Sequence, residues 1–438
     1  MAVPSFIRPS VAREIKTIDM HTTGEPARIV YSGFPDITGT LLEQRATALA
    51  EHDHIRRSLM FEPRGHPDMY GAVLRPSTEL VDAGAAHMGA LFLTHEGYST
   101  MCGHATIALA RLLVDCDDPS IFPRRPDLPF DPATRTLELR LHVPCGLVRV
   151  TVPAVQTSSS SSSSSPSTPT TFRTDPSRPR ITYLSVPSFA LRPHSPPPCI
   201  PIPPSLRWPQ LPAHTTRIAS AALSYGGAFS LIVPAPALGF PATALTATSP
   251  SQIPALRRAA TSLKRAFNAD PALRRTLQSH LDPGVPAELQ QSTVYSVFVT
   301  EPGAGRVLDG CAGAETGLCV FGDGQVDRSP TGSGVQARVA LAVARGERRV
   351  GEGWAYHSLV SNGFGGGGEG GFVGRAVEEV EVEVGTAGGG GGEEGGREVV
   401  KGVRVEVSGW ASYTGCHVFV VEEGDEIGAG FSFEALGG

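Results

Sequence analysis

MCGHATIALA (residues 101–110) and PTGSGVQARVA (residues 330–340) are two copies of one pattern at distant places in the chain. Each copy sets a small side chain, Cys102 or Thr331, in front of a glycine, a polar residue and a small residue. An alanine-rich stretch with helical periodicity follows both times. The repeat therefore predicts a duplicated half-site, in which each half stands at the start of a helix.

A helix start of this kind is suited to hold an anion. The first turn of a helix has unpaired N–H groups and carries about half a positive charge, so two such ends that face each other are expected to bind a carboxylate between Cys102 and Thr331. The same positive end lowers the pKa of a thiol. The pattern thus predicts Cys102 as a thiolate that removes a proton, with the alternative that it is a buried core residue.

Length and charge limit the classes of function. The chain has 438 residues. Chains of this length usually form more than one hydrophobic core, so we expect two domains. Lys and Arg number 37 against 43 Asp and Glu, and the net charge of -6 argues against a nucleic-acid or membrane-surface binder. Apolar runs such as 339–344 are too short to cross a bilayer, and residues 1–16 contain no apolar segment of signal-peptide length. We expect a cytoplasmic protein.

Cysteine and lysine usage excludes two further kinds of site. The seven cysteines have no CxxC spacing, which fits neither a disulfide framework nor a zinc site, so we expect no metal and mostly reduced, buried thiols. Only Lys16, Lys264 and Lys401 occur, and none follows a glycine in a phosphate-binding loop. A P-loop is therefore excluded.

Low-complexity stretches interrupt the chain. Ser158–Ser165 is an unbroken serine run within a Ser/Pro/Thr-rich segment at about 157–179, and this composition predicts a disordered insertion. The proline cluster 193–212 predicts an extended connection between domains. Residues 363–371 and 385–396 consist mostly of glycine and glutamate and predict long surface loops.

Hydrophobic patterns between these stretches predict more strands than helices. Alternating or continuous apolar runs predict strands at 28–30, 137–141, 147–152, 230–233, 293–299, 376–384 and 403–407. Helical periodicity predicts helices at 105–114, 253–267, 271–280 and 335–345.

Four motifs in this order resemble those of the proline racemase family, namely IDMHTTGEP (18–26), RGHPDMYG (64–71), MCGH (101–104) and DRSPTGSG (327–334). Weaker similarity is present at VPSF (186–189), SYGGAF (224–229) and WASYTG (410–415). The resemblance covers nearly the whole chain outside the insertions, and on these motifs the chain is identified as a member of that family.

The resemblance implies an α+β fold like that of diaminopimelate epimerase. Two pseudo-symmetric lobes would each wrap mostly antiparallel strands around a central helix, with a cofactor-free active site in the cleft between them. We expect residues 1–200 to form the N-terminal lobe with the Cys102 motif, and residues 201–438 the C-terminal lobe with the Thr331 motif. The last strands of the C-terminal part could pair with strands of the first lobe.

One position decides which reaction the resemblance implies. Racemases of the family carry a second cysteine, in the pattern SPCGTG, where this sequence has Thr331. Racemisation needs one base on each face of Cα, and a threonine hydroxyl ionises far less readily than a thiol. The members with threonine here need only one base, and the resemblance to them implies dehydration of trans-3-hydroxy-L-proline to Δ1-pyrroline-2-carboxylate by a cofactor-independent hydro-lyase. Two alternatives stay open: a proline or 4-hydroxyproline racemase or epimerase, and an amino-acid-binding protein without catalysis.

The site hypothesis assigns a role to each of these residues. Cys102 removes the Cα proton, and the substrate carboxylate is held by backbone N–H groups of the two helix starts, those of Gly103, His104, Gly332 and Ser333. By resemblance, Asp327 contacts the ring nitrogen. Thr331 positions the substrate, although Thr331 and Ser333 could also only cap the helix. The protonated Cys102 or His104 gives a proton to the leaving hydroxyl. We expect hydroxyproline as the small-molecule partner, no nucleic acid or membrane, and a homodimer.

Overall fold

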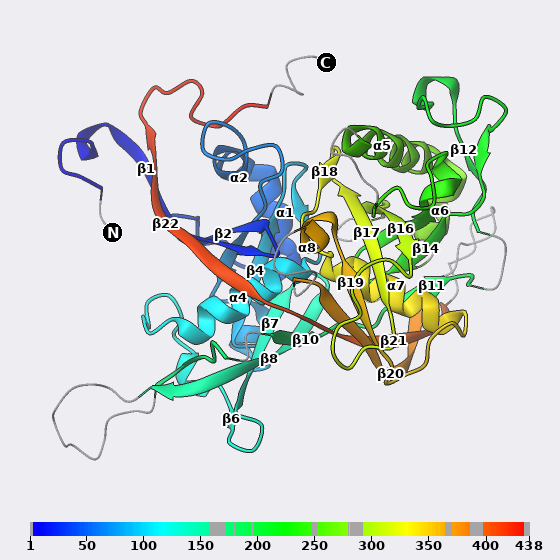
Figure 1. Ribbon diagram of the computed structural model, residues 1–438. Helices are drawn as coiled ribbons and strands as arrows, with labels where there is room; N and C mark the ends of the chain where they lie inside the picture. The colour runs from blue at the N-terminus through cyan, green and yellow to red at the C-terminus, as the bar shows by residue number, and fades with distance from the viewer. Residues whose placement is uncertain are drawn as a thin grey trace.

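The computed structural model describes residues 3–157, 171–177, 180–193, 197–246, 252–278, 280, 292–363, 370–385 and 397–432. Strands dominate, and two groups of strands each surround one helix (Figure 1). The serine run Ser158–Ser165 lies outside the described residues, as do 364–369 and 386–396 of the two glycine-rich stretches. All the strands and helices that the hydrophobic patterns predict are present, so the predicted α+β class is confirmed.

The first lobe is the group of strands around α4 (Gly103–Asp115). Its main ladder runs β1–β2–β3–β4–β7–β8–β10, in which β2–β3 and β4–β7 are parallel and the other pairs are antiparallel. The strands are β1 (Val11–Thr22), β2 (Glu25–Ser32), β3 (Gly71–Arg75), β4 (Met88–Leu93), β5 (Tyr98–Ser99), β6 (Phe130–Asp131), β7 (Thr136–Val143), β8 (Gly146–Thr157), β9 (Thr171–Thr174) and β10 (Ile181–Leu184). The outer helices are η1 (Arg8–Ser10), α1 (Leu41–Glu51), α2 (Asp53–Met60), α3 (Glu79–Asp82) and η2 (Arg125–Asp127).

The second lobe surrounds α7 (Gly332–Ala344). Its ladder runs β21–β20–β19–β17–β16–β15–β14–β11, with β17–β19 and β15–β16 parallel, and a bridge between Ser188 and Val403 closes the ring. The strands are β11 (Phe189–Leu191), β12 (Ile200–Pro201), β13 (Arg217–Ile218), β14 (Ala222–Tyr225), β15 (Phe229–Pro234), β16 (Ser296–Pro302), β17 (Ala314–Phe321), β18 (Gln325–Val326), β19 (Gly353–His357), β20 (Phe372–Gly385) and β21 (Arg397–Gly409). The other helices are η3 (Pro204–Leu206), η4 (Ala235–Leu238), α5 (Ile253–Ala269), α6 (Pro271–Gln278) and α8 (Leu359–Gly363).

The last two strands join the lobes. β21 pairs with β20 of the second lobe and with β10 of the first, and after Trp410 the chain continues as β22 (Ala411–Glu422), which pairs with β1. The C-terminal strands therefore complete the ring around α4 and tie it to the ring around α7.

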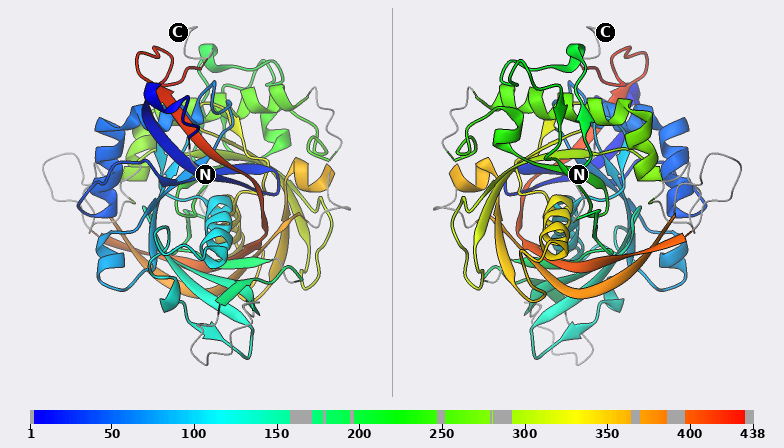
Figure 2. Two further views of the ribbon diagram at one scale, coloured as in Figure 1. Left: turned by 90° about the vertical axis from the view of Figure 1, so that its left-hand side faces the viewer. Right: turned by 90° about the vertical axis from the view of Figure 1, so that its right-hand side faces the viewer.

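Both central helices are enclosed by their strands, as the two views of Figure 2 show. In α4 every residue except Arg111 and Asp115 is buried, and in α7 every residue up to Ala342 is buried. A helix without a polar face needs apolar neighbours on all sides, and a closed ring of strands supplies them. The alanine-rich composition of both helices follows from this confinement, because small side chains allow the strands to approach closely.

Two composition-based predictions fail where tertiary packing intervenes. Residues 171–174, assigned to the disordered insertion, form β9 and pair with the end of β8, because their Thr and Phe side chains suit a strand edge. The proline cluster 193–212 is not a free connection, since Ile200, Trp208 and Leu211 are buried in the core beneath α5. Of the seven free cysteines, only Cys102 and Cys319 are buried, so the expectation of mostly buried thiols is wrong.

Among the helices of the described ranges, none combines the length and the apolar character needed to cross a membrane.

Candidate active site

The two central helices meet at their first residues. A Cβ atom added to Gly332 would lie 2.5 Å from Cα of Gly103 and 2.2 Å from the hydroxyl oxygen of Tyr183, so no side chain fits at this contact. Cys102 and Thr331 stand directly before these glycines. The structure therefore brings together the two half-sites that the repeated sequence pattern predicts.

This contact leads to a first prediction. Gly332→Ala should destabilise the protein by about 1–3 kcal/mol, because the new methyl group meets backbone atoms that cannot rotate away. It should also lower catalytic turnover, since the helix starts must move apart. Urea unfolding and an activity assay check both effects. Gly363→Ala is the matched control, because no atom of the described residues lies within 4 Å of a Cβ at that position; equal stability of the two variants would contradict the close contact.

Cys102 occupies the N-cap position of α4. Its backbone is extended, with φ −146° and ψ 110°, and its Sγ accepts a hydrogen bond from the N–H of Ala105 at 3.3 Å. The Cys102 carbonyl oxygen accepts hydrogen bonds from the backbone and hydroxyl of Thr106. The sulfur atom is thereby fixed at the positive end of the helix.

Thr331 has a different conformation from Cys102, although the two sequences match. Its side chain does not cap α7, so the predicted capping role is wrong; instead Oγ1 donates a hydrogen bond to Oδ2 of Asp327 at 2.7 Å. Its backbone has φ 63° and ψ 103°, which a β-branched residue rarely adopts and which costs about 1–3 kcal/mol. The Thr331 N–H donates to Oγ of Ser329 at 3.1 Å, and the Thr331 carbonyl accepts from Val335 N–H at 2.8 Å. These bonds hold the strained residue in place.

Asp327 organises the loop that leads to α7. Its Oδ1 accepts the N–H of Ser329 at 2.7 Å, and its Oδ2 accepts the Thr331 hydroxyl. The same Oδ2 lies 4.0 Å from Nδ1 of His104 across the junction of the lobes. The carboxylate is thus held rigidly beside the residues of the other half-site.

His104 connects the two half-sites. Its Nδ1 lies 3.2 Å from Sγ of Cys102, and the ring of Tyr70 packs edge-on against it with centroids 4.7 Å apart. Burial lowers the pKa of His104, against the opposing effect of Asp327. A neutral imidazole in contact with a thiol can accept the thiol proton.

The pKa of Cys102 is raised in this closed site, contrary to the prediction. Burial raises the pKa of the thiol more than the hydrogen bond from the Ala105 N–H at the helix start lowers it. The charges of Asp327 and Glu25 raise this pKa further. Removing water from around the thiolate and placing it near two carboxyl groups outweighs the effect of the helix start.

The predicted catalytic centre is closed to solvent. Cys102, His104, Asp327, Thr331 and Ser333 are at most 9% exposed. Two ion pairs span the junction of the lobes, Asp68 with Arg328 at 2.7 Å and Glu96 with Lys264 at 3.2 Å. A substrate therefore reaches Cys102 only when the lobes move apart.

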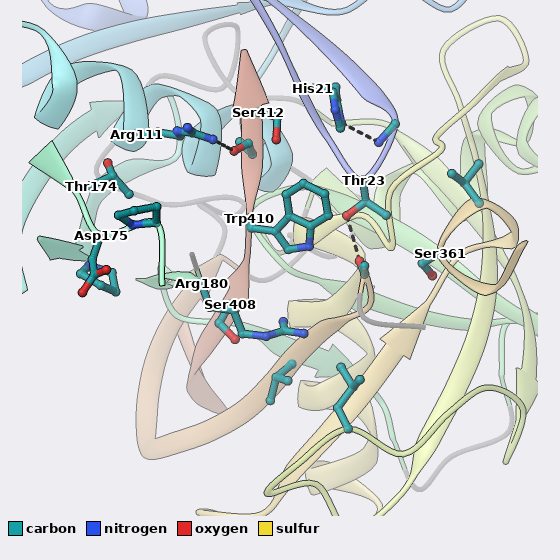
Figure 3. Close-up of a pocket in the computed structure, with 18 of the residues that line it drawn as sticks. His21, Thr23, Arg111, Thr174, Asp175, Arg180, Ser361, Ser408, Trp410 and Ser412 are labelled. Atoms are coloured by element: carbon teal, nitrogen blue, oxygen red, sulfur yellow. Dashed lines mark hydrogen bonds between the residues drawn. The ribbon is translucent and has the colours of Figure 1, made fainter. Parts of the chain in front are cut away.

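A groove of about 1210 Å3 lies beside this centre (Figure 3). It contains none of the predicted site residues and is lined from both lobes, for example by Arg111, Ser361 and Trp410. Thr23, at the turn between β1 and β2, also lines it and donates a hydrogen bond to the Gly370 carbonyl at 2.8 Å. The neighbouring Thr22 hydroxyl donates to the His104 carbonyl at 2.9 Å. The β1–β2 turn is thus a wall between the groove and the catalytic centre.

Glu25 is part of the motif IDMHTTGEP (18–26), but the sequence alone predicts no role for it. The structure buries it completely at the start of β2, where its Oε2 accepts the N–H of Arg328 at 2.7 Å. An acidic residue at the head of an apolar strand was the signal available in the sequence. Its proximity to Asp327 depends on the fold.

Two more side chains lie beside Cys102 and Thr331, and the sequence did not predict them as part of the site. The Tyr70 hydroxyl forms a hydrogen bond with Oγ of Ser99 at 2.6 Å, and the Tyr70 ring packs against His104. Cys319, expected only as a core residue, is buried in β17, and its backbone carbonyl accepts the N–H of Asp327 at 3.1 Å. Cys319 belongs to no motif, so nothing in the sequence indicated this contact.

No group of three or more His, Cys, Asp or Glu side chains in the described ranges is placed to hold a metal ion.

Comparison with solved structures tests the fold. A hydroxyproline epimerase from Agrobacterium vitis, with bound trans-4-hydroxy-L-proline, matches with a TM-score of 0.67 at 21% identity over 96% of each chain. The predicted two-lobed fold is confirmed by this likeness.

Comparison with known sequences tests the family. A human protein named trans-3-hydroxy-L-proline dehydratase is 34% identical over 419 residues, 95% of this chain and 94% of that protein. A protein of the same name from Colwellia psychrerythraea is 29% identical over 362 residues, 82% of each. The family model described as proline racemase matches residues 17–166 and 218–432. The family match and the alignment with the human relative each cover most of this chain, and the chain therefore belongs to the proline racemase family.

Proposed function

We propose that the protein is a trans-3-hydroxy-L-proline dehydratase, a hydro-lyase that needs no cofactor. The observation that carries this is the asymmetry of the two helix starts. Cys102 presents a thiol beside His104, whereas Thr331 presents a hydroxyl that already donates its hydrogen bond to Asp327. One base suffices for elimination, but not for racemisation by two bases. The names of the human and Colwellia psychrerythraea relatives support the same reaction.

Substrate binding would use charges of both signs. The carboxylate of the amino acid is held by the free N–H groups at the starts of α4 and α7, those of Gly103, His104, Gly332 and Ser333. The ring ammonium lies against Asp327, whose position is fixed by Ser329 and Thr331. This arrangement places Cα of the substrate between Cys102 and Thr331.

Proton removal follows from the same contacts. The substrate ammonium offsets the negative charge of Asp327, which raises the pKa of Cys102 in the empty site. His104, 3.2 Å from the sulfur, accepts the thiol proton, and the thiolate then takes the Cα proton. The helix starts stabilise the charge that develops on the carboxylate. Loss of water from C3 leaves an enamine, which tautomerises to Δ1-pyrroline-2-carboxylate.

Proton NMR of the purified protein with trans-3-hydroxy-L-proline in D2O tests this function. We expect loss of substrate together with growth of pyrroline-2-carboxylate signals. An intact substrate with deuterium at Cα would instead indicate an epimerase. Neither elimination nor exchange would indicate an amino-acid-binding protein.

The residue at position 331 provides a second prediction. Thr331→Cys should create racemisation of L-proline, because a thiol then stands on each face of Cα. Chiral chromatography of the product and deuterium incorporation at Cα measure it. Thr331→Ser keeps a hydroxyl at this position and is the control that should give no racemisation. A folded Thr331→Cys variant without any D-proline would count against the two-base argument.

A further inference from the structure

Glu25 lies between the two half-sites. It is the first residue of β2, directly after the turn at Thr23 and Gly24, and it pairs with Thr22 in the β1–β2 ladder. The Thr22 hydroxyl donates to the carbonyl of His104 at 2.9 Å, which fixes the turn to the start of α4. On the other side, Oε2 of Glu25 accepts the N–H of Arg328 at 2.7 Å, one residue after Asp327. The carboxyl group is therefore tied to both lobes at the catalytic centre.

One oxygen of this carboxyl group lacks a partner. Oε1 is buried, and no group in the described part of the chain forms a hydrogen bond with it. A buried polar atom left without a partner costs about 1–3 kcal/mol. Such an atom is rare in a folded protein and points to a partner that arrives with a ligand.

Burial and the surrounding charges favour the protonated form of this carboxyl group. Glu25 faces Asp327, and the guanidinium of Arg328 is engaged with Asp68 at 2.7 Å rather than with Glu25. Burial, and then the charge of Asp327, raise the pKa of Glu25 well above its usual range. Because Oε2 accepts an N–H, the proton of the neutral form would sit on Oε1, the oxygen that has no partner in the described part of the chain. A neutral carboxyl group held in this way is a ready proton donor.

We propose that Glu25 is the acid that protonates the leaving 3-hydroxyl group, an inference that rests on the dehydratase function proposed above. The Cys102 thiolate takes the Cα proton, and the electrons of that C–H bond form the Cα–C3 double bond. The C3–O bond breaks with its electron pair on oxygen, and the proton from Oε1 completes a water molecule. Glu25 is left as a carboxylate and regains a proton when the site opens.

The geometry of the substrate agrees with this assignment. In trans-3-hydroxy-L-proline the hydroxyl and the Cα hydrogen lie on the same face of the ring, so the acid must come from the side of Cys102. Glu25 belongs to the same lobe as Cys102. His104 is less suited, because its Nδ1 contacts the Cys102 sulfur and a neutral imidazole is a much weaker acid than a carboxyl group.

A change of leaving group tests the role of Glu25. Glu25→Gln keeps the size of the side chain and an oxygen for the Arg328 N–H, but it removes the acidic proton. With trans-3-hydroxy-L-proline the variant should lose at least about 100-fold in kcat, the usual contribution of a general acid. With trans-3-fluoro-L-proline it should stay within a few-fold of the unaltered protein, because fluoride leaves without being protonated. Release of pyrroline-2-carboxylate, followed by NMR, measures both.

The outcomes separate the two proposals. Equal losses with both substrates, or no loss with either, would overturn the role of Glu25 while the dehydratase function stands. If the unaltered protein eliminates from neither substrate, the proposed function itself fails, and the acid role with it. Asp68→Asn is the matched control, because it removes a carboxylate that also contacts the Arg328 segment. It should change both rates by the same factor.

Discussion

Cys102→Ser is expected to lower the turnover of trans-3-hydroxy-L-proline by about 10,000-fold and to leave its binding nearly unchanged. A serine hydroxyl ionises far less readily than a thiol, and the burial that raises the pKa of Cys102 would disfavour an alkoxide still more. The substrate contacts assigned to the helix starts and to Asp327 remain. NMR in D2O measures the turnover, and isothermal calorimetry measures the binding.

A second thiol serves as the control for this experiment. Cys416 is exposed on β22, where it pairs with Ile18 of β1, so Cys416→Ser should keep full turnover. If Cys102→Ser retains more than a tenth of the turnover of the unaltered protein, another group is the base. Loss of binding together with turnover would indicate that the substitution disturbs the site rather than its chemistry.

Asp327→Asn is expected to lower kcat/KM by about 1,000-fold, with most of the loss in KM. The carboxylate is buried and accepts hydrogen bonds from Ser329 and Thr331, and in the proposed complex it pairs with the substrate ammonium. Removing one partner of a buried charged pair costs about 2–5 kcal/mol. Steady-state kinetics with trans-3-hydroxy-L-proline measure the change.

The pH profile of this variant gives an independent readout. The charge of Asp327 raises the pKa of Cys102, so its removal lets the thiol ionise at lower pH. Activity rises as the thiol ionises, and the rising limb should therefore move to lower pH in Asp327→Asn. Asp309→Asn, in the outer groove, should change neither kcat/KM nor the profile. A rising limb that stays in place in Asp327→Asn would contradict the coupling between Asp327 and Cys102.

The two helix starts show which structural features local sequence predicts and which it does not. The residues around Cys102 predict a helix and its start correctly, because both depend on neighbours within one turn. The same reasoning fails for Thr331, whose backbone is held at φ 63° by its loop and by Asp327. Two matching patterns thus gave two different conformations, because the surroundings of the second residue overrode its local preference.

The pKa values of the site residues could not be predicted from the sequence. The lowered pKa predicted for Cys102 considers only its own helix, whereas the structure adds burial and the carboxyl groups of Asp327 and Glu25. Asp327 is far from Cys102 in the sequence, and so is Glu25, which lies at the start of β2. Glu25 received no role because its unpartnered oxygen exists only once the lobes are joined.

The sequence by itself determined most of the helices and strands, the order of the motifs, and the presence of a thiol at Cys102 and a hydroxyl at Thr331. These properties follow from side-chain chemistry and from contacts within a few residues, which the chain carries in any conformation. Only the tertiary structure decided the contact of Gly103 with Gly332, the closure of the site and the raised pKa values of Glu25 and Cys102. Desolvation and charge–charge interactions depend on which distant segments come together, and the two rings of strands determine this by meeting at the starts of their central helices.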